Sequence, residues 1–244
     1  GYDFTEAFLR CCNSPAPLSI QVNTLKVSAA DYARALARAE LEYECCDEPV
    51  SCITLQGGSA TELPGFDEGL FYVQDRAARM AVEIAAPKAG MRVLDACSCP
   101  GGKSFAAAIA MGNRGSILAC DIHEKKLRLV RDGAQRLGID IIETAAMDAR
   151  AFRAELAESF DVVVADVPCS GFGVIAKKPE IRSKTPESIA ELPKIQGEIL
   201  DNVSKYVRPG GVLLYSTCTV TAEENENTVK AFLERNGEYT AEPF

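Results

Sequence analysis

The pattern of hydrophobic and polar positions changes near residue 74 and divides the chain into two regions. In the second region, short runs of Val, Leu and Ile alternate with amphipathic segments. The runs predict strands at 91–95, 115–120, 139–144, 160–167 and 212–216. The segments between them predict helices at 74–86, 102–111, 124–137 and 151–156, a long helix ending at Pro209-Gly210-Gly211, and a helix at 222–235. Apolar strands separated by helices are typical of a parallel sheet covered on both faces, so we expect a doubly wound, Rossmann-like α/β fold over residues 75–244.

The first region has a shorter and less regular pattern. Alternating or apolar runs predict strands at 19–23, 52–55 and 70–73, and an alanine-rich amphipathic stretch after Ser28 predicts a helix over 29–41. Residues 1–74 are therefore expected to form a small α/β subdomain.

The composition is that of an ordinary globular protein. Of 244 residues, 47% are hydrophobic and 25% are charged, which argues against a disordered or fibrous chain. The longest apolar runs, such as 162–165, are far shorter than the roughly 18 residues of a membrane span. No secretory leader pattern opens the sequence, so we expect a cytoplasmic, monomeric protein with no membrane partner.

The ten cysteines and the single histidine, His123, bear on disulfides and metals. Several cysteines lie within apolar runs, and neighbours such as Cys11 and Cys12 are poor bridge partners, so a disulfide framework is not expected. Cys97-Ser98-Cys99 is no zinc motif by itself, and we expect no metal centre. Most of the cysteines are interpreted as small buried hydrophobes.

The charge is unevenly distributed along the chain. The net charge is −9, and residues 1–75 carry 4 basic and 12 acidic side chains, whereas residues 76–131 carry 10 basic and 4 acidic ones. An acidic surface repels nucleic acid. The basic middle region could nevertheless form a surface that binds a polyanion, although such charges more commonly lie on solvated helix faces.

Ligands of doubly wound sheets bind where the strands end, near the switch point of the strand order. After the first predicted strand, the stretch Asp95-Ala-Cys-Ser-Cys-Pro-Gly-Gly-Lys-Ser104 makes a glycine turn that opens a helix. A phosphate-binding Walker loop would need glycine at Cys97, and the dinucleotide pattern GxGxxG is also missing. Acidic residues also follow the next three predicted strands; they are Asp121, Asp148 and Asp166. Their recurrence at strand ends predicts a nucleoside-shaped pocket, in which Asp121 could accept hydrogen bonds from ribose hydroxyls.

Two cysteines follow neighbouring strands. Cys169 lies in Asp166-Val-Pro-Cys-Ser-Gly171 and Cys218 in Ser216-Thr-Cys-Thr219, beside Pro, Ser, Thr and Gly rather than apolar residues. A cysteine is usually a buried structural residue, but this setting favours reactive thiols. A thiolate at neutral pH needs an electropositive setting, which Lys103, Lys177, Lys178 or the helix after Cys218 could supply.

These motifs resemble the Sun/Nop family of RNA cytosine-5 methyltransferases, and its bacterial 16S ribosomal RNA members of the RsmB (Sun) type most closely. The resemblance covers nearly the whole chain and rests on the two cysteine motifs, the 95–103 loop, Gly173 to Glu180, Gln196 to Asp201 and Glu223-Glu-Asn225. It implies methylation of cytosine carbon 5 in RNA, not DNA, by S-adenosyl-L-methionine, and a small RNA-recognition-like subdomain at the start of the chain. It also implies that the chain lacks a preceding helical RNA-binding domain and the last strand pair of the sheet.

The resemblance assigns roles to individual residues. Cys218 would add to carbon 6 of the base, Cys169 would assist release of the product, Asp166 would hold or protonate the base edge at N3, and Lys103 would join this catalytic set. Cofactor contacts would come from the 97–103 loop, Asp121, Asp148 and Asp166; the loop residues are Cys97, Ser98, Cys99, Pro100, Gly101, Gly102 and Lys103. An RNA-binding or assembly module with a vestigial cofactor pocket remains the alternative, although such a module would not need both cysteines.

Overall fold

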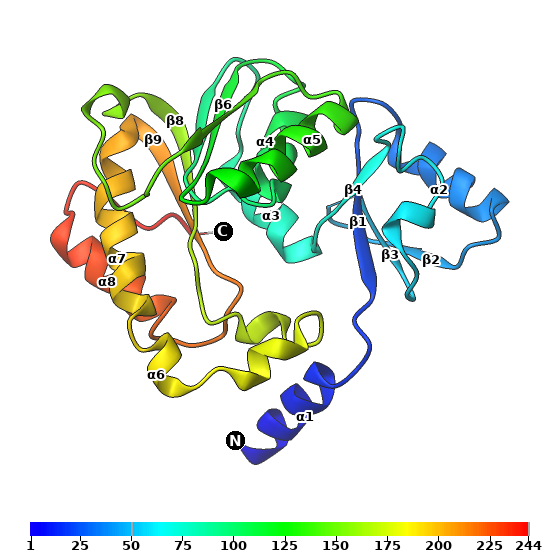
Figure 1. Cartoon of the computed structure of the whole chain (residues 1–244), viewed down its shortest axis with the longest axis horizontal. Coiled ribbons are helices and arrows are strands. Elements are labelled where there is room, and N and C mark those ends of the chain that lie inside the picture. Colours follow the sequence, from blue (N-terminus) through cyan, green and yellow to red (C-terminus); the bar gives the residue numbers. More distant parts are fainter. Residues whose placement is uncertain (50, 244) are drawn as a thin grey trace.

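The computed structural model describes residues 1–49 and 51–243 and contains two sheets that lie side by side (Figure 1). The larger sheet has five parallel strands in the order β7-β6-β5-β8-β9. Their bounds are β5 Arg92–Asp95, β6 Ser116–Asp121, β7 Ile142–Ala146, β8 Phe160–Asp166 and β9 Val207–Ser216. The strand order reverses between β5 and β8, so the switch point lies where these two strands end. The Rossmann-like fold predicted for this region is confirmed.

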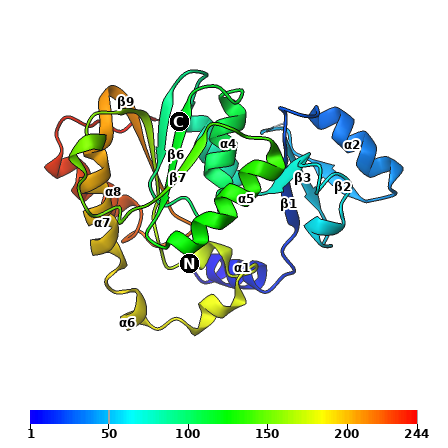
Figure 2. The ribbon, with the colours of Figure 1, turned by 45° about the horizontal axis from the view of Figure 1, so that its top comes forward.

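Helices cover both faces of this sheet (Figures 1 and 2). Within β8, Val162 and Val164 pack with helices α3, α4 and α5, whereas Val163 and Ala165 pack with α7 and α8. This alternation explains the continuous apolar run, because both faces of a central parallel strand are buried. The helices are α3 Arg76–Ala85, α4 Gly102–Ala110, α5 Leu127–Leu137, α7 Leu192–Val203 and α8 Glu226–Arg235, with the short α6 Pro186–Ile189 before α7.

The smaller sheet is antiparallel, with the order β2-β3-β1-β4. Its strands are β1 Leu18–Val22, β2 Tyr43–Cys45, β3 Cys52–Leu55 and β4 Phe71–Val73. Helix α2, Ala29–Arg38, packs Tyr32 and Leu36 against this sheet, and the Ser28 side chain caps the helix by accepting from the backbone N–H of Asp31. The predicted helix start is correct, but the helix ends at Arg38 rather than at residue 41.

Several predicted boundaries are wrong. Helix α1, Tyr2–Cys12, and strand β2 were not predicted, and the 151–156 segment contains only a 3-10 turn, at Ala154–Leu156. Pro209-Gly210-Gly211 does not end a helix but lies within β9. A proline is tolerated there because β9 is at the edge of the sheet, next to an irregularity in its pairing with β8. Strand β7 begins three residues later than predicted, and α8 begins four residues later.

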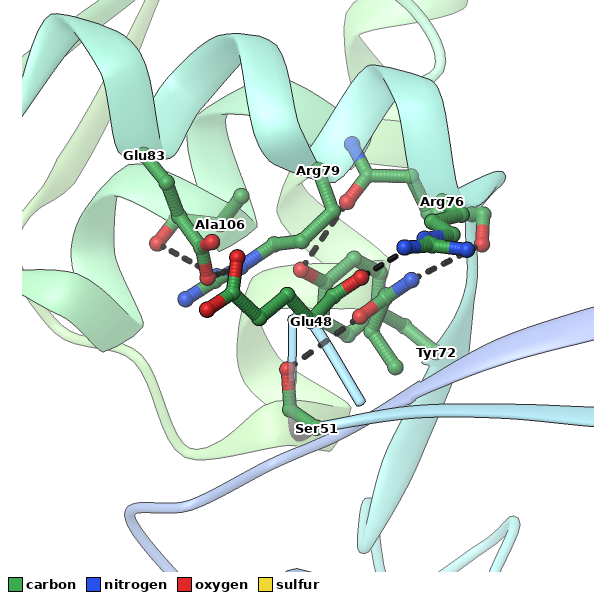
Figure 3. A network of polar contacts seen from close by, with 9 residues as sticks. Glu48, Ser51, Tyr72, Arg76, Arg79, Glu83 and Ala106 are labelled. Atoms are coloured by element: carbon green, nitrogen blue, oxygen red, sulfur yellow. Dashed lines mark hydrogen bonds and ion pairs between the residues drawn. The ribbon is translucent and has the colours of Figure 1, made fainter. Parts of the chain in front are cut away.

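A polar network joins the two sheets, and Figure 3 shows part of it from close by. Arg76 of α3 donates to the backbone oxygen of Glu48 in the small subdomain at 2.6 Å, and the buried Arg79 joins α3 to α4 by donating to the backbone oxygen of Ala106 at 3.1 Å. On the other side, the buried Asn23 side chain donates to the backbone oxygens of Gly69 and Leu137, each at 2.9 Å. The small subdomain is therefore held against α5 by the buried hydrogen bond of Asn23 and against α3 by the exposed bond of Arg76.

Within the described ranges, 1–49 and 51–243, no helix is long and apolar enough to cross a membrane. The same residues contain no cluster of three His, Cys, Asp or Glu side chains arranged to hold a metal ion.

Candidate active site at the strand ends

The loop between β5 and α4 opens a helix N-terminus toward the strand ends. Gly101 has a φ of +117°, which a residue with a side chain rarely adopts, and α4 begins directly after it at Gly102. The Ser98 backbone N–H donates to the backbone oxygen of Cys120, near the end of β6, at 2.7 Å, and this bond fixes the loop to the neighbouring strand. The N-terminus of α4 has no side-chain cap.

Two polar atoms at this loop are buried without a hydrogen-bond partner among the described residues. They are Oγ of Ser98 and Oδ1 of Asp95. The other oxygen of Asp95 accepts from the Ser104 hydroxyl at 2.7 Å. Burial raises the pKa of Asp95 to about 7, although the Ser104 hydrogen bond opposes this shift. Unpaired buried polar atoms next to an open helix N-terminus are what a site for a polar ligand would present.

Lys103 and Asp166 form an ion pair at the switch point. The Lys103 Nζ lies 2.8 Å from Oδ2 of Asp166, and the other Asp166 oxygen accepts from the Ser216 hydroxyl at 2.6 Å. The lysine side chain is 11% exposed and that of the aspartate is 37% exposed, so the pair borders an opening rather than the core. Three segments meet here, because Lys103 comes from α4, Asp166 from β8 and Ser216 from β9.

The two strand-end cysteines are in direct contact. The Sγ atoms of Cys169 and Cys218 are 3.2 Å apart, and the Cys218 backbone N–H donates to Sγ of Cys169 at 3.3 Å. Both thiols are free, Cys218 is exposed and Cys169 is half-buried. The prediction that these residues share one site is therefore consistent with the geometry.

The two sulfurs have opposite acidities. The hydrogen bond from Cys169 lowers the pKa of Cys218 to about 7; burial and Asp166 oppose this, and Lys178 and Lys103 add to it. The same bond, together with burial, raises the pKa of Cys169 above its ordinary value. Cys218 is thus the more acidic thiol of the pair, and Cys169 is the less acidic thiol that can donate to its sulfur.

The other cysteines of the site region have different chemistry. Burial raises the pKa of Cys97, and it raises that of Cys99 to about 11 and that of Cys120 to about 12. These thiols stay protonated at neutral pH and are poor nucleophiles.

The two remaining predicted acids lie at separate points along the same sheet edge. Asp121 ends β6, and its Oδ1 accepts from the backbone N–H of His123 at 2.8 Å. Asp148 follows β7, where its carboxylate forms an ion pair with Arg150 at 2.8 Å. Hydrogen bonds from Arg150 lower the pKa of Asp148. Lys177, one of the cations expected near the cysteines, instead forms an ion pair with Asp75.

Sequence reasoning assigned no role to a buried polar cluster behind the cysteines. Glu224 is 3% exposed and Gln196 is fully buried, and both contact the loop that carries Cys169. Both residues lie in the motifs that carried the resemblance, and that was the only signal in the sequence that could have found them. Asn225, next in the chain, contacts both threonines that flank Cys218.

Comparison with known proteins agrees with this geometry. A sequence model of the family described as 16S rRNA methyltransferase RsmB/F matches residues 82–244, and a model of its ferredoxin-like domain matches residues 1–62. The chain belongs to the RsmB/F methyltransferase family. The resemblance stated from the sequence motifs is thereby confirmed, as is the small subdomain preceding the methyltransferase sheet.

Individual relatives match along nearly the whole chain. The probable ribosomal RNA small subunit methyltransferase B of Bacillus subtilis (strain 168) is 35% identical over 98% of this chain and 54% of its own length. The ribosomal RNA small subunit methyltransferase F of Escherichia coli O7:K1 is 36% identical over 90% of the chain and 47% of its own length. The chain spans about half the length of these relatives.

Two solved structures share the fold. The crystal structure of PH0851 has a TM-score of 0.91 and 33% sequence identity, and the match covers 96% of this chain and 54% of that one. The structure of NSun6 from Pyrococcus horikoshii with SFG has a TM-score of 0.87 at 21% identity, covering 96% of this chain and 84% of that one.

Proposed function

We propose that this protein methylates carbon 5 of a cytosine in RNA, with 16S ribosomal RNA as the substrate, through a covalent bond between Cys218 and carbon 6 of the base. The observation that carries the proposal is the contact between the Cys218 and Cys169 sulfurs, 3.2 Å apart, next to the Lys103–Asp166 ion pair. Membership of an rRNA methyltransferase family supports the reaction class.

The residues at the β5–α4 loop fit S-adenosyl-L-methionine. The unpartnered Ser98 Oγ, the open N-terminus of α4 and the Asp121 carboxylate supply polar groups at adjoining strand ends, as a nucleoside ligand with a charged amino-acid tail requires. We assign cofactor contacts to residues 97–103 and to Asp121, Asp148 and Asp166. When bound, the cofactor supplies an electrophilic methyl group.

The protein groups perform the remaining chemistry. Carbon 5 of cytosine is a poor nucleophile, and addition of the Cys218 thiolate to carbon 6 makes carbon 5 electron-rich enough to take up a methyl group. Asp166 is assigned to hold or protonate the base at N3, because a proton delivered there neutralises the negative charge that thiolate addition brings to the ring, and Lys103 pairs with this side chain. A base then takes the carbon-5 proton and passes it to solvent, the bond between carbon 5 and carbon 6 becomes double again, and the bond from carbon 6 to the Cys218 sulfur breaks; Cys169 is assigned to assist this release.

Substitution of the two cysteines tests the proposal. Cys218→Ala is expected to abolish methyl transfer to RNA while leaving cofactor affinity within about twofold, because its sulfur forms the bond to the base. Cys169→Ala is expected to accumulate a protein–RNA species that resists denaturant on a gel. Cys45→Ala removes an exposed thiol of the small sheet and serves as the matched control. Full activity of Cys218→Ala would refute the covalent mechanism.

The same assays address the remaining assignments. Methyl transfer to DNA, or cofactor binding without any transfer to RNA, would favour a different substrate or a non-catalytic binding module. We also propose that the protein divides into two units at Gln74, and that it works as a cytoplasmic monomer. Limited proteolysis and light scattering, respectively, test the division and the monomeric state.

A further inference from the structure

A buried carboxylate lies directly behind the loop that carries Cys169. Oε2 of Glu224 accepts the backbone N–H of Ser170 at 2.8 Å and the side-chain amide of Gln196 at 2.9 Å, and Oε1 accepts the Thr221 hydroxyl at 3.0 Å. Gln196 extends the contact by donating to the backbone oxygen of Pro168 at 3.0 Å. The residues on both sides of Cys169 are thus bonded to this cluster.

The loop that carries Cys218 is held by the neighbouring residue. The Asn225 side chain accepts from the Thr217 hydroxyl at 2.6 Å and donates to the backbone oxygens of Thr219 and Thr221, at 3.4 and 2.8 Å. The hydroxyls of Thr219 and Ser170, 2.6 Å apart, join the two cysteine loops directly. Glu224 therefore holds the loop that carries Cys169, and Asn225 holds the loop that carries Cys218.

Glu224 is ionised despite its burial. Burial by itself would raise the pKa of this carboxyl, but the hydrogen bonds from Ser170, Gln196 and Thr221 outweigh it and lower the pKa. An ionised carboxylate accepts stronger hydrogen bonds than a neutral group, so these bonds can hold the groups that donate them in place.

We propose that Glu224 is a positioning residue, whose buried carboxylate holds the Cys169 loop so that the thiol of Cys169 stays in contact with the sulfur of Cys218. The proposal rests on the assignment of these cysteines in the proposed function. Glu224 does not touch the reacting atoms but acts through the backbone of Ser170. Without this anchor the Cys169 loop moves and Cys218 loses its hydrogen-bond donor.

The pH dependence of Cys218 alkylation by iodoacetamide, followed on the Cys218 peptide by mass spectrometry, measures this contact without RNA. In Glu224→Ala the pKa of Cys218 is expected to return from about 7 toward its ordinary value of 9.0. The thiolate fraction at pH 7 then falls from about one half to about 1%, so alkylation slows by up to about 50-fold and recovers above pH 10. Glu223→Ala, which removes the adjacent exposed carboxylate, is the matched control.

Glu224→Gln separates positioning from simple charge. The glutamine can keep its carbonyl oxygen toward Ser170 and Gln196 and turn its NH2 toward the Thr221 hydroxyl, which can accept. Positioning therefore predicts that Glu224→Gln alkylates like the parent protein while Glu224→Ala is slowed. If Glu224 acted only through its negative charge, both variants would make Cys218 more acidic and faster to alkylate at pH 7. That result, or an unchanged profile in Glu224→Ala, would overturn the proposal.

A milder variant covers the case in which Glu224→Ala does not fold. Thr219→Val keeps the shape of the side chain and removes the hydroxyl link between the loops. Alkylation of Cys218 at pH 7 is expected to slow severalfold, and no change in this variant would contradict the coupling of the loops. Because alkylation needs no substrate, a protein that shows these profiles but transfers no methyl group would refute the proposed function and leave the positioning role standing.

Discussion

The Phe105 ring packs between two glycines, and this packing predicts the sign of a change in the free energy of unfolding. A β-carbon built on Gly101 or on Gly133 would lie 2.5 Å from the tip of the Phe105 ring. The ring is 7% exposed, and the Tyr72 ring meets it edge-on with centroids 5.8 Å apart. Phe105 therefore contacts the loop before α4, helix α5 and the last strand of the small sheet at once.

The substitution Gly133→Ala sets two effects against each other. Gly133 lies within α5, where alanine is intrinsically more stable than glycine by about 1 kcal/mol. An added methyl group that overpacks a filled core costs about 1–3 kcal/mol, and the confined Phe105 ring places this site at the upper end. We expect a net loss of about 2 kcal/mol in the free energy of unfolding.

Urea unfolding followed by circular dichroism measures the effect, with Gly197→Ala as the matched control. Gly197 also lies within a helix, but its nearest neighbour is the end of the Arg235 side chain at 3.8 Å, so this substitution should stabilise the protein by about 1 kcal/mol. In a Phe105→Leu background, Gly133→Ala should lose its penalty, which gives a coupling energy of about 3 kcal/mol.

If Gly133→Ala stabilised the protein as much as Gly197→Ala, the Phe105 ring would not be confined as the contacts indicate. Phe105 would then not fix the start of α4 or the glycine turn of the proposed cofactor site.

Alkylation of Cys218 should reach half its maximal rate near pH 7 rather than near the ordinary cysteine pKa of 9.0, and a midpoint at that ordinary value would contradict the sulfur contact. Asn23→Ala should lower the free energy of unfolding by about 1–3 kcal/mol in urea, because two carbonyls lose their shared donor. For Asp95, whose folded pKa of about 7 exceeds the ordinary 3.8, stability should fall as pH rises between these values; Asp95→Asn should remove this slope in unfolding measured from pH 4 to 8.

The fold could be predicted because the strands of the large sheet are apolar on both faces. Val162 to Ala165 form a continuous apolar run that is too short for a helix, and a short apolar run between two predicted helices indicates a buried strand. The edge strand was harder, since Pro209 and two glycines are turn signals in sequence, and only pairing to β8 shows that they continue a strand. Strand β2 has little burial and depends on its pairing with β3, so its own sequence carries little signal.

The site was predictable only in part. The cysteines, Asp166 and Lys103 follow strands or open a helix, and that rule brings them to one edge. Glu224 could not be predicted as buried, because it lies in a run of acidic and amide residues that would ordinarily face solvent. Its donors, Ser170 and Gln196, lie 54 and 28 residues away, so its burial is a property of the folded chain.

The contact between the two sulfurs depends on the register of β8 and β9. These strands pair with Asp166 opposite Ser216, so Cys169 and Cys218 follow three and two residues later. No turn sets this register, because a long crossover containing α7 joins the strands. A slip of one residue would exchange the two faces of β9, whereas a slip of two would keep each side chain on its own face and move the sulfurs by roughly 7 Å. The hydrophobic pattern cannot exclude the two-residue slip. The Ser216–Asp166 hydrogen bond and the Glu224 cluster exclude it, because the slip would break both. The polar contacts at the strand ends therefore select the one register in which the cysteines meet.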